Sequence, residues 1–341
     1  MRLGIQLGYG GEGFAQAVDE VAEFEAAGAD LVVVPEAYSF DAVSQLGYLA
    51  ARTTRMELAS GVMQLYTRTP TLTAMTAAGL DYVSGGRFSL GLGASGPQVI
   101  EGFHGVAYDA PLARTREIVE ICRRVWRRET LVHEGERYRI PLPPARPLKL
   151  INRPVRDRIP ILLAAMGPRN VALAAEIADG WQALFLDPAV SPEVFGPALA
   201  EGRARRDPAL GPLDVMVPLP FAVAEPTDHL LARHRAQLAL YIGGMGTFAG
   251  DLVRRYGYVA ETATIRELFR SGRRAEAAAA VPERLVHATA LVGPPADLRD
   301  RVARLAAAGV TTLLVSPLAA TRAERVKEVV ELKHVLIDGS L

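Results

Sequence analysis

Two short segments of this chain have residue types that could hold a flat ligand close to the backbone. Gly61 follows the apolar segment LAS and has no side chain, so a ring system could approach its backbone closely. Ala94, Ser95 and Gly96 follow a second apolar segment and offer small side chains and free backbone N–H groups. Residues 58–105 predict a strand, a helix and a second strand, which would place both segments at strand ends.

A third segment has the composition of a phosphate-binding turn. It reads AAMGPRN and contains Ala164, Ala165, Met166, Gly167, Pro168 and Asn170. Its leading residues are small, and Pro168 favours the first turn of a helix, where free N–H groups can bind an anion. An ordinary strand-to-helix turn has the same composition, so both interpretations stay open from the spacing alone.

Glu36 and Tyr9 are the candidates for moving a proton. Glu36 follows the apolar run VVVP directly, and Tyr9 comes shortly after the first predicted strand. Carboxyl groups and phenols both act as general acids and bases, and Glu101 is a further candidate of this kind. A glutamate at a strand end also serves as a structural cap for a neighbouring amide, and this alternative stays open.

Several familiar motifs are disfavoured. Gly91, Gly93 and Gly96 spell G-x-G-x-x-G, the nominal dinucleotide-binding fingerprint, but they follow the fourth predicted strand and lead into PQVIEGFHG, which is not a clean helix. His229 and His234 do not share a helix face, and the chain has neither an H-E-x-x-H motif nor a cysteine cluster. A G-x-S-x-G elbow is also absent from the sequence. We therefore expect no metal site and no hydrolytic triad.

The elements that must position these residues alternate between helix and strand. AEFEAAGADLVVVPE and ARLAAAGVTTLLVSP each predict an amphipathic helix, a glycine stop and an apolar strand. Gly28 and Gly309 suit the left-handed position that ends a helix. Continuous apolar runs are typical of parallel strands that are buried on both faces. We expect eight strands, at residues 2–7, 30–34, 56–62, 87–92, 159–165, 180–186, 213–223 and 310–315.

Eight such strands favour an α/β fold of the TIM (β/α)8 barrel type over an open sheet. We expect one domain over residues 1–341, with insertions near 130–158, which is hairpin-like and rich in proline, and near 225–290, which is helical. Chemistry in such a barrel lies at the carboxyl-terminal ends of the strands. The aromatic residues near these ends could either wall a flat ligand or pack in the core: Tyr9, Tyr38, Tyr66, Trp181 and Phe185.

The composition predicts a soluble cytoplasmic enzyme that acts on a small molecule. Half of the 341 residues are hydrophobic, and 38 basic residues balance 38 acidic ones. The balanced charge gives no electrostatic footprint for nucleic acid, and no apolar run reaches the roughly 18 residues that span a membrane. The first residues enter a strand without a signal-peptide pattern, and the one cysteine, Cys122, suits a reducing compartment.

Four longer segments carry a resemblance to a known family. In order they read VVVPEAYSFDAVSQLGYLAARTTRMELASGVMQLYTRTP, DYVSGGRFSLGLGASGPQVIEGFHG, PLARTREIVEICRRVWRRE and PILLAAMGPRNVALAAEIADGW. Together they resemble the luciferase-like superfamily, and within it the coenzyme F420-dependent oxidoreductases near the methylenetetrahydromethanopterin reductases. The resemblance extends from Met1 to about Pro317. It implies a TIM barrel with insertions, a homodimer or tetramer, and hydride transfer to or from C5 of a deazaflavin.

The resemblance also implies roles for individual residues. Gly61 and Val62 match a non-proline cis peptide whose bulge backs the deazaflavin ring, and Glu36 matches an acidic position beside that ring. Residues 94–97 match the loop that lines the cofactor, and residues 165–168 match the loop that receives its phosphate-bearing tail. The implied cofactor-binding set is Glu36, Gly61, Val62, Ala94, Ser95, Gly96, Pro97, Ala164, Ala165, Met166, Gly167, Pro168 and Asn170.

The chain departs from the family pattern at three positions. Sugar-phosphate dehydrogenases of this branch have a histidine where this chain has Ala37 and a glutamate where it has Gly96. The pterin reductases have a glutamate in the first strand, where this chain has Gln6, which cannot donate a proton as a carboxylic acid does. The substrate therefore stays open.

The sequence thus predicts an F420-dependent oxidoreductase that works as a reductase on an unidentified small organic substrate. Glu36 and Tyr9 are the expected catalytic residues. The first alternative is an FMN-dependent luciferase-like monooxygenase, and the second is an F420-binding protein without turnover. Comparing the binding of F420 with that of FMN would distinguish the F420-dependent oxidoreductase from the FMN-dependent monooxygenase. Turnover assays would distinguish an enzyme from an F420-binding protein without turnover.

Overall fold

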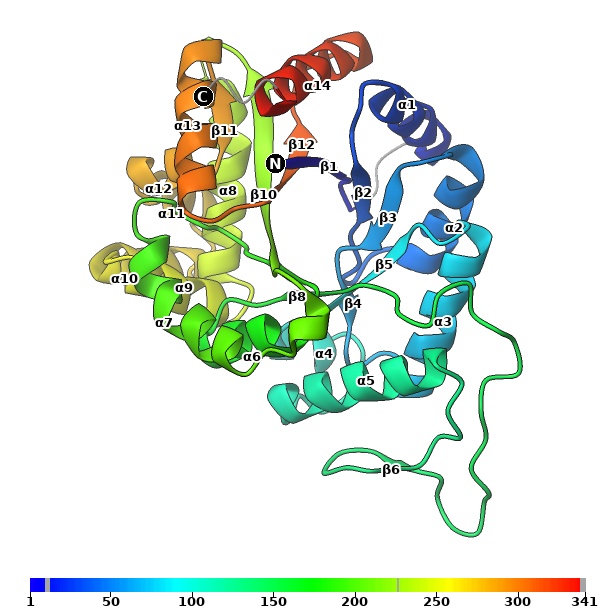
Figure 1. The fold of residues 1–341 in the computed structure, drawn as a ribbon. Coiled ribbons are helices and arrows are strands. Elements are labelled where there is room, and N and C mark those ends of the chain that lie inside the picture. Colours follow the sequence, from blue (N-terminus) through cyan, green and yellow to red (C-terminus); the bar gives the residue numbers. More distant parts are fainter. Residues whose placement is uncertain (10–12, 226, 338–341) are drawn as a thin grey trace.

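Eight parallel strands close into a barrel in the computed structural model, which describes residues 1–9, 13–225 and 227–337 (Figure 1). The barrel strands are β1 (Arg2–Gln6), β2 (Leu31–Val34), β3 (Glu57–Ser60), β5 (Phe88–Gly93), β8 (Ile161–Ala164), β9 (Gly180–Gln182), β10 (Asp214–Val223) and β12 (Thr312–Pro317). They pair in chain order, and β12 pairs with β1, so the sheet closes on itself. The predicted TIM barrel is confirmed.

The side chains of β2 alternate between the barrel interior and the layer of helices. Leu31 and Val33 belong to a small buried cluster, and Val32 and Val34 belong to the large cluster that the helices share. The other members of the small cluster are Ala59, Leu162, Met216 and Leu314. Gly4 leaves room for this interior, because a Cβ there would lie 2.6 Å from methyl carbons of its strand neighbours. The barrel interior is therefore a packed core, which leaves the strand ends to meet a ligand.

Helices surround the barrel (Figure 1). They are α1 (Phe14–Ala26), α2 (Ala42–Arg52), α3 (Pro70–Val83), α4 (Pro97–Ile100), α5 (Pro111–Trp126), α6 (Pro168–Ile177), α7 (Ser191–Ala204), the short 3-10 helix η1 (Pro208–Leu210), α8 (Asp228–Gly243), α9 (Phe248–Arg255), α10 (Val259–Arg270), α11 (Arg274–Ala279), α12 (Glu283–Ala288), α13 (Pro295–Ala307) and α14 (Arg322–Ile337). Gly28 and Gly309 have φ of +93° and +87°, so both glycine stops adopt the left-handed conformation that the sequence predicts.

Residues 130–158 form an extended arm that projects away from the barrel (Figure 1). The arm contains an antiparallel hairpin of β6 (His133–Glu134) and β7 (Arg139–Ile140). Glu117 of α5 anchors this hairpin, since its carboxylate accepts hydrogen bonds from the backbone N–H groups of residues 136–138 and contacts the His133 ring. The stem of the arm is fastened by Arg156, which pairs with the fully buried Asp81 of α3.

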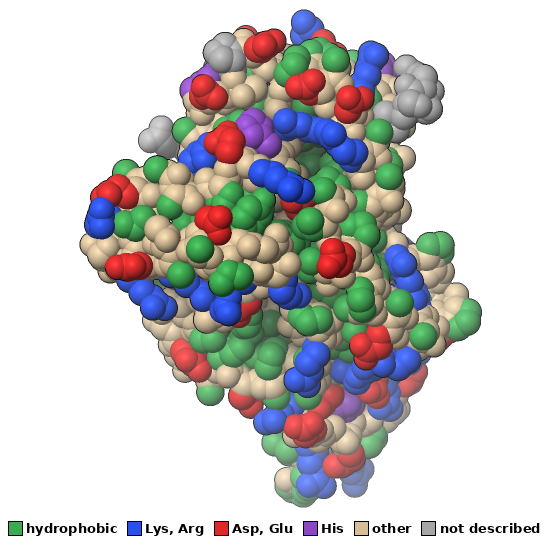
Figure 2. All heavy atoms as spheres, turned by 90° about the vertical axis from the view of Figure 1, so that its left-hand side faces the viewer, with side chains coloured by type: hydrophobic (Ala, Val, Ile, Leu, Met, Phe, Trp, Pro, Cys, Tyr) green, Lys and Arg blue, Asp and Glu red, His purple; other side chains and the backbone are tan. Residues whose placement is uncertain are grey.

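Helices α8 to α12 form a second added region between β10 and β11 (Leu291–Gly293). Strand β11 extends the sheet beyond β10, and the two-residue β4 (Met63–Gln64) pairs with β5. Figure 2 shows Lys and Arg side chains mixed with Asp and Glu side chains on the face of the molecule that includes these helices. No single sign of charge dominates that face.

Two of the predicted strands end at least two residues earlier than expected. Strand β9 ends at Gln182 rather than 186, and Phe185 just beyond it has a φ of +55°, which a strand cannot continue through. Strand β3 ends at Ser60 rather than 62. The short strands β4 and β11 were not predicted, because two or three residues carry no readable periodicity. No helix of the described residues is long and apolar enough to cross a membrane.

Candidate functional site

The strand ends that carry the predicted site residues meet at the carboxyl-terminal end of the barrel. Gly61 packs against Val33 of β2, where a Cβ on Gly61 would lie only 2.0 Å from a methyl carbon. Val62 packs against Gly93 of β5, where an added Cβ would lie 2.5 Å from Cγ2 of Val62. Gly93 in turn pairs with Ala164 of β8. The ends of four consecutive barrel strands, β2, β3, β5 and β8, are thus closely packed here.

The peptide bond that joins Gly61 to Val62 is cis in the structure. Next to it, between the ends of β5 and β8, a cavity of about 20 Å³ brings together residues from two of the predicted loops. Its lining includes Ala94, Ala164, Ala165 and Asn170. This cavity is smaller than any cofactor ring, so it marks where the two loops adjoin and does not itself accommodate one.

The glycines of the G-x-G-x-x-G motif serve strand packing. A Cβ at Gly91 would lie 1.7 Å from the carbonyl oxygen of Ser60, and the Ser60 hydroxyl bonds to both backbone groups of Gly91 at 2.9 Å. Gly96 precedes the four-residue helix α4, and Ser95 before it has a φ of +58°. A dinucleotide fold is excluded by the closed barrel, in agreement with the sequence interpretation.

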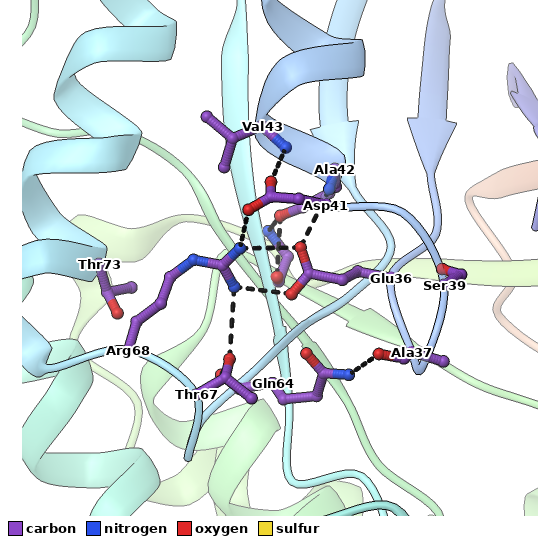
Figure 3. Close-up of polar contacts among 12 residues, drawn as sticks. Glu36, Ala37, Ser39, Asp41, Ala42, Val43, Gln64, Thr67, Arg68 and Thr73 are labelled. Carbon is purple, nitrogen blue, oxygen red and sulfur yellow. Dashed lines mark hydrogen bonds and ion pairs between the residues drawn. The ribbon is translucent and has the colours of Figure 1, made fainter. Parts of the chain in front are cut away.

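Glu36 has both carboxylate oxygens engaged within the protein (Figure 3). Its Oε1 and Oε2 accept hydrogen bonds from Arg68 at 2.6 and 2.9 Å, and Oε2 also accepts one from the N–H of Ala42 at 3.1 Å. Arg68 reaches Asp41 as well, at 3.2 Å, and the Glu36 side chain is only 7% exposed. The arrangement joins the loop after β2 to the loop before α3, which is what a positioning residue would do.

Two glutamines near Glu36 have free amide oxygens. The Nε2 of Gln64 donates to the carbonyl of Ala37 at 2.7 Å, while its Oε1 is buried without a partner in the described part of the chain (Figure 3). The Oε1 of Gln6, at the end of β1 and close to Gly61, is buried and unpaired in the same way. Buried oxygens of this kind usually accept a hydrogen bond, so both point to a donor that a ligand could supply.

The segment 165–168 is held from two sides. Trp181 donates through its ring N–H to the carbonyl of Ala165 at 2.9 Å, and Arg255 of α9 donates to the carbonyl of Met166 at 2.7 Å. Gly167 precedes α6 and has no side chain that could cap the helix. No side-chain cap therefore accepts a hydrogen bond from the first N–H groups of α6. The second terminal nitrogen of Arg255, Nη1, is buried without a partner among the described residues.

Tyr9 lies at the end of β1 beside Tyr241 of α8. Burial of the hydroxyl raises the pKa of Tyr9 above its usual value of 10, and the neighbouring phenol of Tyr241 only partly offsets this effect. Burial raises the pKa of Tyr241 as well. Both phenols are therefore protonated at neutral pH and can donate a hydrogen bond. Glu101, the further candidate, is exposed, and its carboxylate accepts from the N–H of Tyr108 at 3.0 Å as a structural cap would.

Sequence reasoning did not identify Arg68, Arg255 or Tyr241 as parts of this region. Arg255 and Tyr241 come from the helices after β10, and no spacing rule connects them to strand ends far away in the sequence. Arg68 lies in the loop after β4, so the sequence indicates that it is near the strand ends. The sequence does not indicate that it pairs with Glu36. Among the described residues, no three His, Cys, Asp or Glu side chains are grouped so that they could hold a metal ion.

A closed α/β barrel with a small-residue site at its carboxyl-terminal end defines a class of barrel enzymes. Within that class, the family described as Luciferase-like monooxygenase matches residues 1–312, and the chain belongs to this family. The family resemblance in the sequence is therefore confirmed.

One relative and two solved structures are similar to this chain over nearly its whole length. A protein of Mycobacterium tuberculosis is 42% identical to this chain, and the match covers 97% of this chain and 99% of the relative. Its name gives it, as a provisional assignment, as a coenzyme F420-dependent oxidoreductase. The coenzyme F420-dependent tetrahydromethanopterin reductase of Methanopyrus kandleri superimposes with a TM-score of 0.82 at 23% identity, over 98% of this chain and 99% of its own. The oxygenating constituent of a Pseudomonas putida diketocamphane monooxygenase, a complex with FMN, gives a TM-score of 0.67 at 18% identity, over 100% and 99% of the two chains. At these identities the two structures support the fold alone.

Proposed function

We propose that this protein is a coenzyme F420-dependent oxidoreductase that works as a reductase on a small organic substrate in the cytoplasm. The observation that carries the proposal is that the buried, unpaired amide oxygens of Gln6 and Gln64 lie at the same end of the barrel as the closely packed backbone of Gly61 and Val62. The name of the 42% identical relative supports F420 as the cofactor.

The residues of the site fit a deazaflavin. Its polar edge carries both N–H and carbonyl groups, and the free Oε1 atoms of Gln6 and Gln64 are suited to accept from an N–H. A Cβ on Gly61 would collide with Val33, so glycine lets the backbone after β3 lie against β2 at this end of the barrel. The anionic tail would meet the N-terminus of α6 and the free Nη1 of Arg255, which together favour a phosphate. When bound, the deazaflavin would supply the hydride.

In this proposal, Glu36 and Tyr9 have different roles. The bidentate pair of Glu36 with Arg68 fixes the two loops beside the cofactor, so Glu36 positions the cofactor and does not deliver a proton. Tyr9 keeps its proton at neutral pH and is the candidate donor to the substrate. An FMN-dependent monooxygenase is the second candidate, favoured by the fold shared with the FMN-bound neighbour.

Titration of the purified protein with F420 and, separately, with FMN tests the cofactor assignment. We expect F420 to bind at least about tenfold more tightly, which corresponds to about 1.4 kcal/mol. Deazaflavin and flavin fluorescence report the two equilibria directly. Tighter binding of FMN would overturn the proposal and favour the monooxygenase, and F420 binding without turnover of any carbonyl or alkene substrate would favour the carrier.

A further inference from the structure

Five aromatic side chains lie at the carboxyl-terminal end of the barrel, and four of them form two pairs. The rings of Phe185 and Tyr241 meet edge to face with centroids 5.2 Å apart, and the Tyr241 phenol interacts with that of Tyr9. The ring of Tyr38, which follows β2, lies 6.1 Å from that of Phe103. Four of these residues follow β9, β1, β2 and β5 and one lies on α8, and we call these five residues the aromatic arc.

Much of the aromatic arc is exposed. Phe103 is 66% exposed, Tyr38 is 53% exposed and Tyr9 is 51% exposed. Single exposed aromatic residues are ordinary, but several at the strand ends of a barrel offer apolar surface where ligands of this fold bind. Rings of this kind pack against other flat rings in stacked or edge-to-face geometry. The surface is therefore suited to a ring-containing compound.

The loops around the arc offer no free cation to an anionic compound. In the stretches 35–41, 61–69, 94–110 and 183–190, the one Lys or Arg in the sequence is Arg68. Arg68 is only 11% exposed and is paired with Glu36. Arg255 lies on a helix and is directed at residue 166, in the segment that the proposed function assigns to the cofactor tail. A carboxylate or phosphate on the substrate would remain unpaired beside the arc, and this disfavours anions.

We infer that the aromatic arc binds an uncharged, ring-containing carbonyl compound, whose oxygen accepts a hydrogen bond from Tyr9 or Tyr241. This inference rests on the proposed function and names its substrate class. In the reduction, one hydride from reduced F420 would form the new C–H bond at the carbonyl carbon, the C=O π electrons would pass to oxygen, and a phenol proton would form the O–H bond. The phenol would regain its proton from water.

Binding of matched naphthalene compounds to the purified protein tests this inference without turnover. The probes are acetylnaphthalene, ethylnaphthalene, naphthoate and naphthyl phosphate, followed by ligand-observed NMR with and without F420. We expect acetylnaphthalene to bind at least about tenfold more tightly than either anion. Of the variants Tyr9→Phe and Tyr241→Phe, the one that removes the donor should weaken acetylnaphthalene by about fivefold, the value of one hydrogen bond, and neither should change the binding of ethylnaphthalene. Unchanged binding of acetylnaphthalene in both variants would overturn the inference.

Phe103→Ala should weaken both neutral compounds by about tenfold through the loss of ring contacts. Phe40→Ala is the matched control, because Phe40 is 73% exposed on the same loop as Tyr38 but is in none of the aromatic pairs of the described residues. Equal losses in both variants, or equal binding of ketone and anions, would overturn the inference. The F420 titration separates the two proposals: F420 binding with no preference for neutral rings overturns only the substrate class. Ring binding without F420 binding overturns the proposed function.

Discussion

The sequence is compatible with two roles for Glu36, and the contacts of Glu36 in the structure favour one of them. An acidic residue after a buried strand is compatible with proton transfer and with loop positioning. The bidentate contact with Arg68 and the bond from the Ala42 N–H engage both carboxylate oxygens. A carboxylate held in this way is strongly oriented, which is useful to a cofactor whose ring must be placed accurately.

We therefore expect Glu36→Gln to weaken F420 binding by about tenfold while turnover at saturating cofactor stays within about threefold of the wild type. The amide cannot form the ion pair with Arg68, so the two loops lose their connection. Fluorescence titration gives the affinity, and F420 oxidation with one substrate gives the turnover. Asp41→Asn is the control, because Asp41 also reaches Arg68 but its side chain is 60% exposed. A fall in turnover of about 100-fold with unchanged affinity would restore Glu36 as a proton donor.

Among the secondary-structure elements, the hairpin of β6 and β7 depends on a single buried carboxylate. Burial of Glu117 works to raise its pKa, but hydrogen bonds from His133 and from the N–H groups of Tyr138 and Arg137 outweigh burial and hold the pKa below its ordinary value of 4.5. Neighbouring Glu120 on the same helix lies 3.8 Å from the other ring nitrogen of His133. A lowered pKa in the folded state means that the ionised carboxylate stabilises the fold.

The stabilisation of the fold by ionised Glu117 should be complete above the pKa that this residue has in the unfolded chain. It should disappear as the pH falls through the lower pKa of the folded protein. We expect Glu117→Gln to lower the free energy of unfolding by about 1–2 kcal/mol near neutral pH and by much less near about pH 3. Urea unfolding at the two pH values measures the difference. Glu120→Gln, with a side chain that is 55% exposed, serves as the comparison. A Glu117→Gln effect that is equal at both pH values would contradict the assignment.

The sequence predicted the barrel and its strands because each strand is a continuous apolar run between recognisable helix ends. It predicted less of the site. Gly61 and the 94–97 loop were identified because small residues at strand ends are unusual, and the resemblance supplied their roles. Pairings such as Glu36 with Arg68, and contributions from distant helices such as Arg255, depend on tertiary packing that no local spacing encodes.

At the scale of the whole molecule, the outer face of α3 exposes large apolar side chains, and a single copy of the chain does not explain their exposure. Asp81 is the helix's one charged residue, and it is fully buried against Arg156. Exposed residues of the helix include Leu72, Met75, Tyr82 and Val83, and those of the adjoining arm include Leu148, Ile151 and Val155. A helix that is apolar all round is typically buried.

We expect a second copy of this chain to cover this surface. An uncharged face can meet itself across a two-fold axis without like-charge repulsion. Gly79 at the centre of the face has nothing within 4 Å of an added Cβ, so its backbone leaves room for a close helix–helix approach. Val155 of the arm lies by the end of the same helix, because Arg156 anchors the arm to Asp81 and Val155 lies near Gly86.

We therefore expect the protein to sediment at twice the 36.6 kDa mass of the chain, or at a multiple of that dimer. Met75→Glu should shift it toward the monomer, because a two-fold contact brings the two new charges together in a desolvated interface, which costs several kcal/mol. Val259→Glu is the control, since Val259 is 58% exposed at the start of α10, away from α3. Analytical ultracentrifugation at micromolar concentrations measures all three proteins. A wild-type protein of 36.6 kDa, or a Met75→Glu variant that keeps the wild-type mass, would show that α3 is not the contact between copies.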